Sequence, residues 1–537
     1  MTSSAGAGLT SFAGTGALLR LAWRRDRWVI TTAALLMAAT AYASMAATLD
    51  LYSDPAQAAA GAKVMADNPS LTALYGPLPS LTSEGIGVLK TIMMGSLFSA
   101  FLAFAIVRRH TRTEEEEGRF ELVAGGVVGR RAPLAAAVGL ALLAVVGTAA
   151  LSSLSLLPTG VDLTGSLALG AVEVVAGLVM TGITAVAVQL TSTTRGAGGI
   201  AIAALGLAFA LRAMADTSTG RGQDLVNASF LGWAEQVSPF GANRLWWLVP
   251  AAVLTALLLV VADVLLQRRD LGAGLWAARP GPARAAASLG SPLGLAWRLQ
   301  RGSLLGWTLG YAVLGLVVGS IASSVNQIVD SPGIEEMFRK MSGGQGSILD
   351  VFFGAELRFM SVGAAAYGIS TTLRLRSEEG SGRGEVVLAT RVSRWQWLAS
   401  HAVVAAAGSV WLLTVVGVAA GLAAGSATSS GIAQLLPAAL ATAPAVLVCV
   451  ALTVLLFGLL PRWSALAWGL LTLFVLLGEF GALLSLPSWA LGLSPFDHLG
   501  SLPGGEANAA GLVWLTALAA LVGAVGFTAF RRRDLAA

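Results

Sequence analysis

The chain has 537 residues, of which 55% are hydrophobic and only 12% are charged. A soluble globular protein carries about 25% charged residues, so this composition excludes an ordinary soluble domain and indicates a membrane protein. The only cysteine, Cys449, lies in an apolar run, which excludes a disulfide within the chain and any Cys-based metal site. The formal net charge of +5 does not by itself indicate nucleic acid, because its distribution follows membrane orientation, as described below.

Continuous apolar runs predict transmembrane helices, because about 20 apolar residues cross a bilayer and a β-barrel would instead show period-two alternation. We therefore expect an all-α polytopic membrane protein with about twelve spans. The segment 478–496 is ambiguous and could change the count by one. The expected spans are 28–48, 86–107, 133–157, 165–190, 197–215, 245–266, 303–324, 357–373, 397–422, 433–459, 464–485 and 509–529.

The first span could be mistaken for a cleaved signal peptide, because basic residues precede an apolar run that ends in Ala41-Tyr42-Ala43. The run is long for a signal peptide, and a similar segment at 303–324 cannot be one, so we predict a transmembrane helix. Before each of these two spans, alternating Trp, Arg and apolar residues favour either a helix lying in the membrane interface or a basic and aromatic anchor at the helix end.

A charged segment, 108–131, follows the second predicted span and is called here the first elbow. Thr113 and Glu116 fit a capping box, and acidic residues suit the first turn of a helix, so a short surface helix is expected. A related segment, 374–396, is called the second elbow, and its expected helix covers 377–394. A solvated helix would explain one such segment, but two at equivalent places favour a docking surface.

An internal duplication organises the chain. Leu21-Ala22-Trp23-Arg24 recurs at 295–298, Arg268-Arg269-Asp270-Leu271 recurs at 532–535, and Trp233-Ala234 followed by Ser238-Pro239-Phe240 recurs at 489–496. The closest match places the second elbow 264 residues after the first, with the residues at 112, 114, 115, 118, 119, 121, 123, 128 and 130 identical in both copies.

Six spans in each copy predict two parallel six-helix repeats. We expect a first transmembrane half at 1–266, a cytoplasmic linker with the second interfacial helix at 267–302, and a second transmembrane half at 303–537. Most of the 34 Lys and Arg residues then lie on one side, which predicts cytoplasmic N- and C-termini.

Few charges lie within the spans. Glu173 is in the middle of a helix, Asp263 and Arg212 lie near helix ends, and Glu479 lies toward the outside. Glu173 and Glu479 are candidates for the substrate path or for a proton site, the alternative being helix packing. The loops 49–85, 325–356, 214–244 and 486–508 contain short apolar pieces that could be re-entrant helices or ordinary surface loops.

The elbow motif, Glu-Glu-x-x-Gly-Arg-x-Glu-Leu-Val followed by Val-x-Gly-Arg, resembles the cytoplasmic coupling segment of type-2 ABC transporter permeases. A double-length permease of this kind is similar to actinobacterial exporters of polyketide antibiotics and to multidrug efflux permeases. Glu117, Phe120 and the run 381–384 depart from the family pattern, so equal use of both elbows stays open. The resemblance implies ATPase-coupling roles for Glu114, Glu115, Gly118, Arg119, Glu121, Arg130, Glu378, Glu379, Gly382, Arg383, Glu385 and Arg394.

The chain contains no Gly-x-x-x-x-Gly-Lys-Ser/Thr phosphate-binding loop, so any ATP would be hydrolysed by another protein. His110, His401 and His498 have no catalytic or metal-binding motif around them, so an enzyme and a metal cofactor are not expected. The resemblance implies a plasma-membrane exporter of hydrophobic or amphipathic compounds that works with two copies of a separate ATPase, which would bind ATP and Mg²⁺. The alternatives are an ion-driven twelve-helix facilitator and a non-transporting membrane scaffold.

Overall fold

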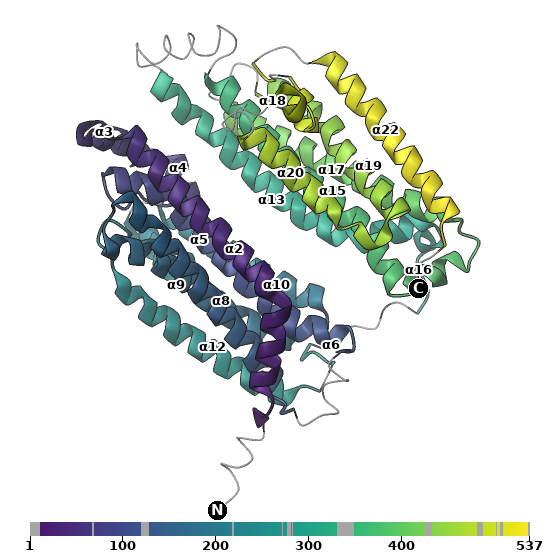
Figure 1. Cartoon of the computed structure of the whole chain (residues 1–537), viewed down its shortest axis with the longest axis horizontal. Helices are drawn as coiled ribbons and strands as arrows, with labels where there is room; N and C mark the ends of the chain where they lie inside the picture. The colour runs from purple at the N-terminus through teal and green to yellow at the C-terminus, as the bar shows by residue number, and fades with distance from the viewer. Residues whose placement is uncertain are drawn as a thin grey trace, which may run out of the picture. The chain divides into compact units, whose positions relative to one another are not determined.

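The chain forms two helical units, Met1–Gly281 (unit 1) and Pro282–Ala537 (unit 2), in a computed structural model (Figure 1). The boundary between the two units lies inside the predicted linker, 267–302. The described residues are 11–66, 69–119, 128–216, 218, 220–270, 272–276, 281, 283–329, 348–425, 431–480, 487–500, 502–504 and 508–534. Within them the protein is helical and has no strand, which confirms the all-α polytopic membrane fold.

Unit 1 is built from long helices that alternate with short ones. The long helices are α2 (Thr15–Leu51), α5 (Ser83–Arg108), α8 (Ala132–Leu156), α9 (Leu163–Leu190), α10 (Thr194–Asp216) and α12 (Leu248–Arg268). The short ones are α3 (Pro55–Ala66), α4 (Pro69–Tyr75), η1 (Arg109–Thr113), α6 (Glu114–Glu116), η2 (Leu157–Thr159), η3 (Gly220–Ala228), α11 (Phe230–Gln236) and η4 (Leu245–Trp247).

Unit 2 repeats this order. Its long helices are α13 (Pro292–Val329), α15 (Ile348–Gly380), α17 (Arg394–Ala424), α19 (Ala443–Leu459), α20 (Leu466–Phe480) and α22 (Ala509–Arg532). Its short helices are η5 (Ala287–Gly290), α16 (Arg383–Leu388), α18 (Gly431–Ala441), η6 (Pro461–Trp463), α21 (Ser488–Leu491) and η7 (Pro495–His498).

Ten helices of the described chain are long and apolar enough to cross a membrane. The two other predicted spans also coincide with helices. The 357–373 segment lies within α15, which carries Glu356, Arg358, Arg374 and Arg376 near its ends and is therefore less apolar than the ten. The 464–485 segment coincides with α20, whose described part is shorter than a full span, and the following residues 481–486 lie outside the described chain.

Local sequence explains where several helices begin. The Thr82 side chain accepts a hydrogen bond from the Gly85 amide at the start of α5, and Asp162 does the same for Gly165 at the start of α9. Ser393 and Gln396 form a reciprocal capping box that starts α17. The predicted interfacial stretches are the first turns of α2 and α13 and continue directly into the following helices, as an anchor at a helix end would.

Helix α9 is the centre of unit 1. It packs against α5, α8 and α12, and most of its residues are buried. Small side chains permit the close approach: a Cβ on Gly177 would lie 2.5 Å from the Ser99 hydroxyl, and one on Gly170 would lie 2.9 Å from the carbonyl oxygen of Ala149. In unit 2, α17 and α19 form the corresponding packing centre with α13, α15 and α22.

Candidate functional site

The acidic residues of the first elbow end a helix, so the predicted capping box at Thr113 is wrong. Helix α5 continues through a π-helical turn into α6, and Thr113 has helical backbone angles and makes no capping hydrogen bond. The acidic residues of the second elbow also end a helix, because Glu378 and Glu379 are among the last residues of α15. Acidic side chains at the carboxyl end of a helix repel the negative end of its dipole, so each acidic pair requires nearby cations.

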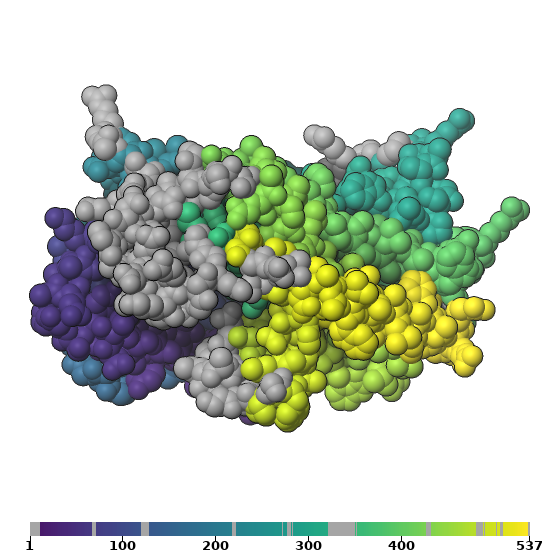
Figure 2. Space-filling view, turned by 90° about the horizontal axis from the view of Figure 1, so that it is seen from above, coloured from purple at the N-terminus to yellow at the C-terminus, as the bar shows by residue number. Residues whose placement is uncertain are grey.

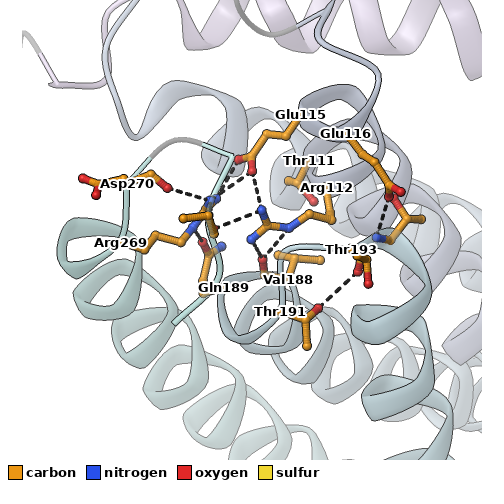
Figure 3. Close-up of polar contacts among 12 residues, drawn as sticks. Thr111, Arg112, Glu115, Glu116, Val188, Gln189, Thr191, Thr193, Arg269 and Asp270 are labelled. Atoms are coloured by element: carbon orange, nitrogen blue, oxygen red, sulfur yellow. Dashed lines mark hydrogen bonds and ion pairs between the residues drawn. The ribbon is translucent and has the colours of Figure 1, made fainter. Parts of the chain in front are cut away.

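Arginine from the end of unit 1 meets this requirement. The Arg269 guanidinium, just after α12, binds both oxygens of Glu115 at 2.6 and 3.0 Å (Figure 3). Its Nε donates to the side-chain oxygen of Gln189 at 2.6 Å, and the Arg269 side chain is only 3% exposed. This ion pair, here called the brace of unit 1, fastens the end of α5 to the end of α12.

A second buried arginine completes the cluster. Arg112 donates from Nε to the carbonyl oxygen of Val188 at 3.0 Å, and from Nη1 to Glu115 at 2.7 Å and to the carbonyl oxygen of Ala273 at 3.2 Å. Glu115 is therefore shared by Arg112 and Arg269 (Figure 3). Next to it, Glu116 accepts a hydrogen bond from the Thr194 amide at the start of α10, at 2.7 Å.

Unit 2 has the same brace at the equivalent positions. Arg533, just after α22, binds both oxygens of Glu379 at 2.7 and 2.8 Å. The Arg533 guanidinium carbon lies 4.9 Å from the Phe457 ring centre and 5.0 Å from that of Phe530. Each elbow is thus fastened to the chain segment that follows the last helix of its own unit.

Arg130 and Arg394 reinforce the braces. Arg130 donates to the carbonyl oxygens of Leu266 (3.0 Å) and Arg269, and Arg394 donates to the carbonyl oxygen of Arg533 at 2.6 Å. In both units, the start of the third long helix is therefore held against the same chain segment as the acidic end of the second.

The rest of each elbow is more exposed. Arg119 pairs with Glu114 at 3.6 Å and Arg383 pairs with Glu378 at 3.7 Å, and the two arginine side chains are 50% and 65% exposed. Gly118 and Gly382 both have positive φ, 71° and 73°, which ends the acidic helix in the same way in both units. The exposed set also contains Glu117, Glu385 and Val386, whereas Glu121 lies outside the described residues.

A cavity of about 90 Å³ adjoins the first elbow between α2 and α8. Its apolar wall is formed by Leu18, Leu21, Ala22, Pro133, Ala136 and Ala137, and its polar side is formed by Arg25, His110, Glu114 and Arg119. Arg25 forms an ion pair with Glu114, which connects the start of α2 to the first elbow.

The charges outside the elbows have separate surroundings. Asp263 forms an ion pair with Arg131 at 2.6 Å. Arg212 is fully buried and binds Glu235 at 2.8 Å, Asp216 at 3.3 Å and two carbonyl oxygens of α4. Burial raises the pKa of the Glu235 carboxyl well above its ordinary value of 4.5. Glu479 belongs to α20, but its side chain lies outside the described residues.

Sequence reasoning missed the arginines of the brace. The Arg-Arg-Asp-Leu repeat was visible, and its second arginine is the residue that binds the acidic pair of each elbow. The elbow repeat and this repeat share the 264-residue spacing, and this common spacing is the signal that could have joined them. Of the predicted residues, Glu115 and Glu379 belong to the braces, and Arg130 and Arg394 reinforce them. Arg119, Arg383 and Glu385 belong to the exposed surface.

Comparison with known proteins covers nearly the whole chain. Residues 289–531 match the family described as multidrug efflux system permease Rv1217c, C-terminal domain. The chain is also 42% identical over 537 residues to the multidrug efflux system permease protein Rv1217c of Mycobacterium tuberculosis (strain ATCC 25618 / H37Rv), an alignment that covers 98% of this chain and 96% of that protein.

Proposed function

The chain belongs to the family of the multidrug efflux system permease Rv1217c, and we propose that it is the membrane-spanning permease subunit of an ATP-driven ABC exporter in the bacterial plasma membrane. The chain has no phosphate-binding loop, so two copies of a separate ATPase would bind ATP and Mg²⁺. Both elbows and both termini would lie on the cytoplasmic side, where ATP is available.

The observation that carries this proposal is the repetition of the brace. Two ion pairs, Glu115 with Arg269 and Glu379 with Arg533, occupy equivalent places in the two units. A force applied to an elbow would reach both the second and the last long helix of that unit, because the brace joins their ends. A two-fold set of such connections suits a permease driven by two identical motor subunits.

The exposed surface of the second elbow suits protein docking. Arg383, Glu385 and Val386 project from α16, and Val386 is 72% exposed. The same helix packs inward through Val387 and Leu388 against the buried Trp397 cluster. A partner that binds the outer face of α16 would therefore push directly on the core of unit 2.

The name of the relative supports the proposed substrate class. The relative is named a multidrug efflux permease, and we infer that this chain exports hydrophobic or amphipathic compounds by alternating access. ATP binding would draw the two ATPases together, and the elbows would transmit this movement to the helices of each unit. Transport by the purified chain alone, driven only by an ion gradient, would contradict the proposal.

The docking step is tested by charge reversal at Glu385. The Glu385→Lys variant should lower the amount of ATPase that co-purifies with the permease at least tenfold, because a repulsive pair replaces an attractive one. Glu121→Lys applies the same test to the first elbow. Asp497→Lys, an exposed acidic residue in η7 outside both elbows, is the matched control and should leave the complex intact. Unchanged complex formation in both elbow variants would contradict the proposal.

A further inference from the structure

Glu173, in the middle of α9, is a buried carboxyl without a hydrogen-bond partner. The residue has no exposed surface, and neither carboxyl oxygen makes a hydrogen bond within the described chain. Two hydroxyls on α8, those of Thr148 and Ser152, are also buried and unpaired. Ser152 is the neighbouring hydroxyl that could hydrogen-bond the carboxyl after a small movement, and Thr148 lies one helical turn from Ser152.

Among the described residues, no charge compensates an ionised carboxylate at this position, and α8 and α9 carry no other charged side chain. The charged side chains of the neighbouring helices belong to other helical turns, and none of them forms an ion pair or hydrogen bond with the Glu173 carboxyl. They are Asp26 and Asp50 with the N-terminal arginines on α2, Glu84, Lys90 and Arg108 on α5, Arg195, Arg212 and Asp216 on α10, Glu235 on α11, and Asp263 and Arg268 on α12. A buried ion without a counter-charge is strongly disfavoured in an apolar interior.

Helix α5 packs closely against the Glu173 side chain. A Cβ added to Gly95 of α5 would lie 3.2 Å from Cγ of Glu173 and 3.5 Å from Cε of Met37. Ser99, also on α5, donates to the backbone oxygen of Glu173 at 2.7 Å and so holds α5 against α9. The described residues contain no cluster of acidic, His or Cys side chains that could hold a metal.

We propose that Glu173 is a proton-binding site within the membrane-spanning part of unit 1. Its carboxyl holds a proton while α5, α8 and α9 are packed as in this structure. When these helices separate and water enters, the O–H bond breaks, the electron pair stays on the carboxylate, and water accepts the proton. Opening of unit 1 is then accompanied by release of one proton, and repacking by its return.

The helices of unit 2 that correspond to α9 carry no counterpart of Glu173. These helices, α18 and α19, follow α17 as α9 follows α8 and contain no acidic or basic residue. At the position of α9 the two units therefore differ chemically, although they share one fold.

Infrared spectroscopy of the full-length protein in lipid at pH 7 tests the protonation directly. Exposed carboxyls are almost fully ionised at this pH, so the C=O band of protonated carboxyls reports buried groups. Glu173→Gln should abolish one component of this band, and Ser152→Ala should shift that component without abolishing it. Glu235→Gln is the control and should leave the component unchanged.

A loss of ionised-carboxylate intensity in Glu173→Gln, or no loss in either band, would overturn the proposal. If Glu173→Gln does not fold, Glu173→Asp should shift the component, and an unshifted component would overturn the proposal as well.

The exchange step is measured as the half-time of the band's shift in D₂O. Gly95→Ala loosens the contact between α5 and α9 and should shorten this half-time about tenfold, because local opening controls exchange. An unchanged half-time would overturn proton release by helix separation. None of these measurements requires an ATPase or a transported drug.

Discussion

Each elbow has an equivalent acid–arginine ion pair, but the surroundings of the arginine differ between the two units. In unit 1, Arg269 lies among polar groups, since it binds Glu115, the Gln189 side chain and the carbonyl oxygen of Ala273. In unit 2, Arg533 binds Glu379 and stacks on two phenylalanine rings. The connection between the second and last long helices is kept, whereas the means of supporting it differ.

The contact between the first long helix and the elbow differs more. In unit 1, Asp26 of α2 is buried and binds Arg109 at 2.9 Å and His110 at 2.7 Å. The repeat places Gln300 at the equivalent position of α13, and its amide donates to the carbonyl oxygen of Thr371, three residues before the second elbow, at 3.0 Å. An ionic contact in one unit is thus a neutral hydrogen bond in the other. The brace, the arginine that reinforces it (Arg130 or Arg394) and the left-handed glycine recur at equivalent positions in both units.

The largest difference between the units is expected for loss of the acidic residue of the brace. Glu115→Gln leaves two buried guanidinium groups, Arg112 and Arg269, without their common counter-ion, and should lower the free energy of unfolding by about 3–5 kcal/mol. Glu379→Gln should cost less, because Arg533 keeps its contacts with the rings.

Chemical unfolding of the purified protein measures both losses. Glu117→Gln is the control, because this side chain is 45% exposed and its ion pair is worth little. An equal loss for Glu115→Gln and Glu379→Gln would show that the surroundings of the two arginines do not matter energetically.

Lysine at the brace should have a smaller effect. Arg269→Lys keeps the positive charge, but a lysine cannot bind both oxygens of Glu115 and the Gln189 side chain at the same time. We therefore expect the free energy of unfolding to fall by about 2 kcal/mol. Arg533→Lys should lose about 1 kcal/mol, because its side chain makes fewer hydrogen bonds and is 13% exposed. The same unfolding assay compares them, and a greater loss at Arg533 would reverse the order of the two units.

Much of this architecture could be predicted from the sequence. Long apolar runs predict the helices, and the repeated motifs predict two similar halves, because both signals are local or recur at a fixed spacing. The brace could not be predicted in this way, because its partners are 154 residues apart in each unit and only the packing of six helices brings them together.

The sequence predicts that a helix begins at the acidic residues of the first elbow, whereas a helix ends there, and the difference has a physical reason. Thr113 and Glu116 have the spacing of a capping box, but the same acidic residues can follow a helix when a distant arginine neutralises them. Arg212 and Glu235 illustrate the same limit, because a buried network in the folded protein includes residues that the sequence places near a helix end and in a loop.

The pH dependence of stability should also distinguish the units. Burial raises the pKa of Glu235, so the folded protein holds this proton more tightly than the unfolded chain. The resulting stabilisation is complete below the ordinary pKa of 4.5 and is lost as the pH rises through the folded value. A tenfold difference in proton affinity between the two states is worth about 1.4 kcal/mol.

Glu235→Gln should therefore flatten the pH dependence of the unfolding midpoint above pH 4.5 relative to the wild type. The Trp-Ala repeat places Leu491 at the equivalent position of unit 2, where no such proton exists. The Leu491→Gln control should leave the slope unchanged, and a slope that survives in Glu235→Gln would assign it to another group.

The smallest effect is expected at the glycines that end the acidic helices, and here the units should agree. Gly118 and Gly382 have φ of 71° and 73°, and a Cβ on either would meet no atom within 4 Å. Alanine at either position therefore pays only for its left-handed backbone, about 1 kcal/mol. Asparagine, which tolerates this conformation better, should cost less at both positions. Equal losses in the unfolding assay would mean that the two turns are interchangeable, whereas a larger loss in one unit would reveal a contact made by that elbow alone.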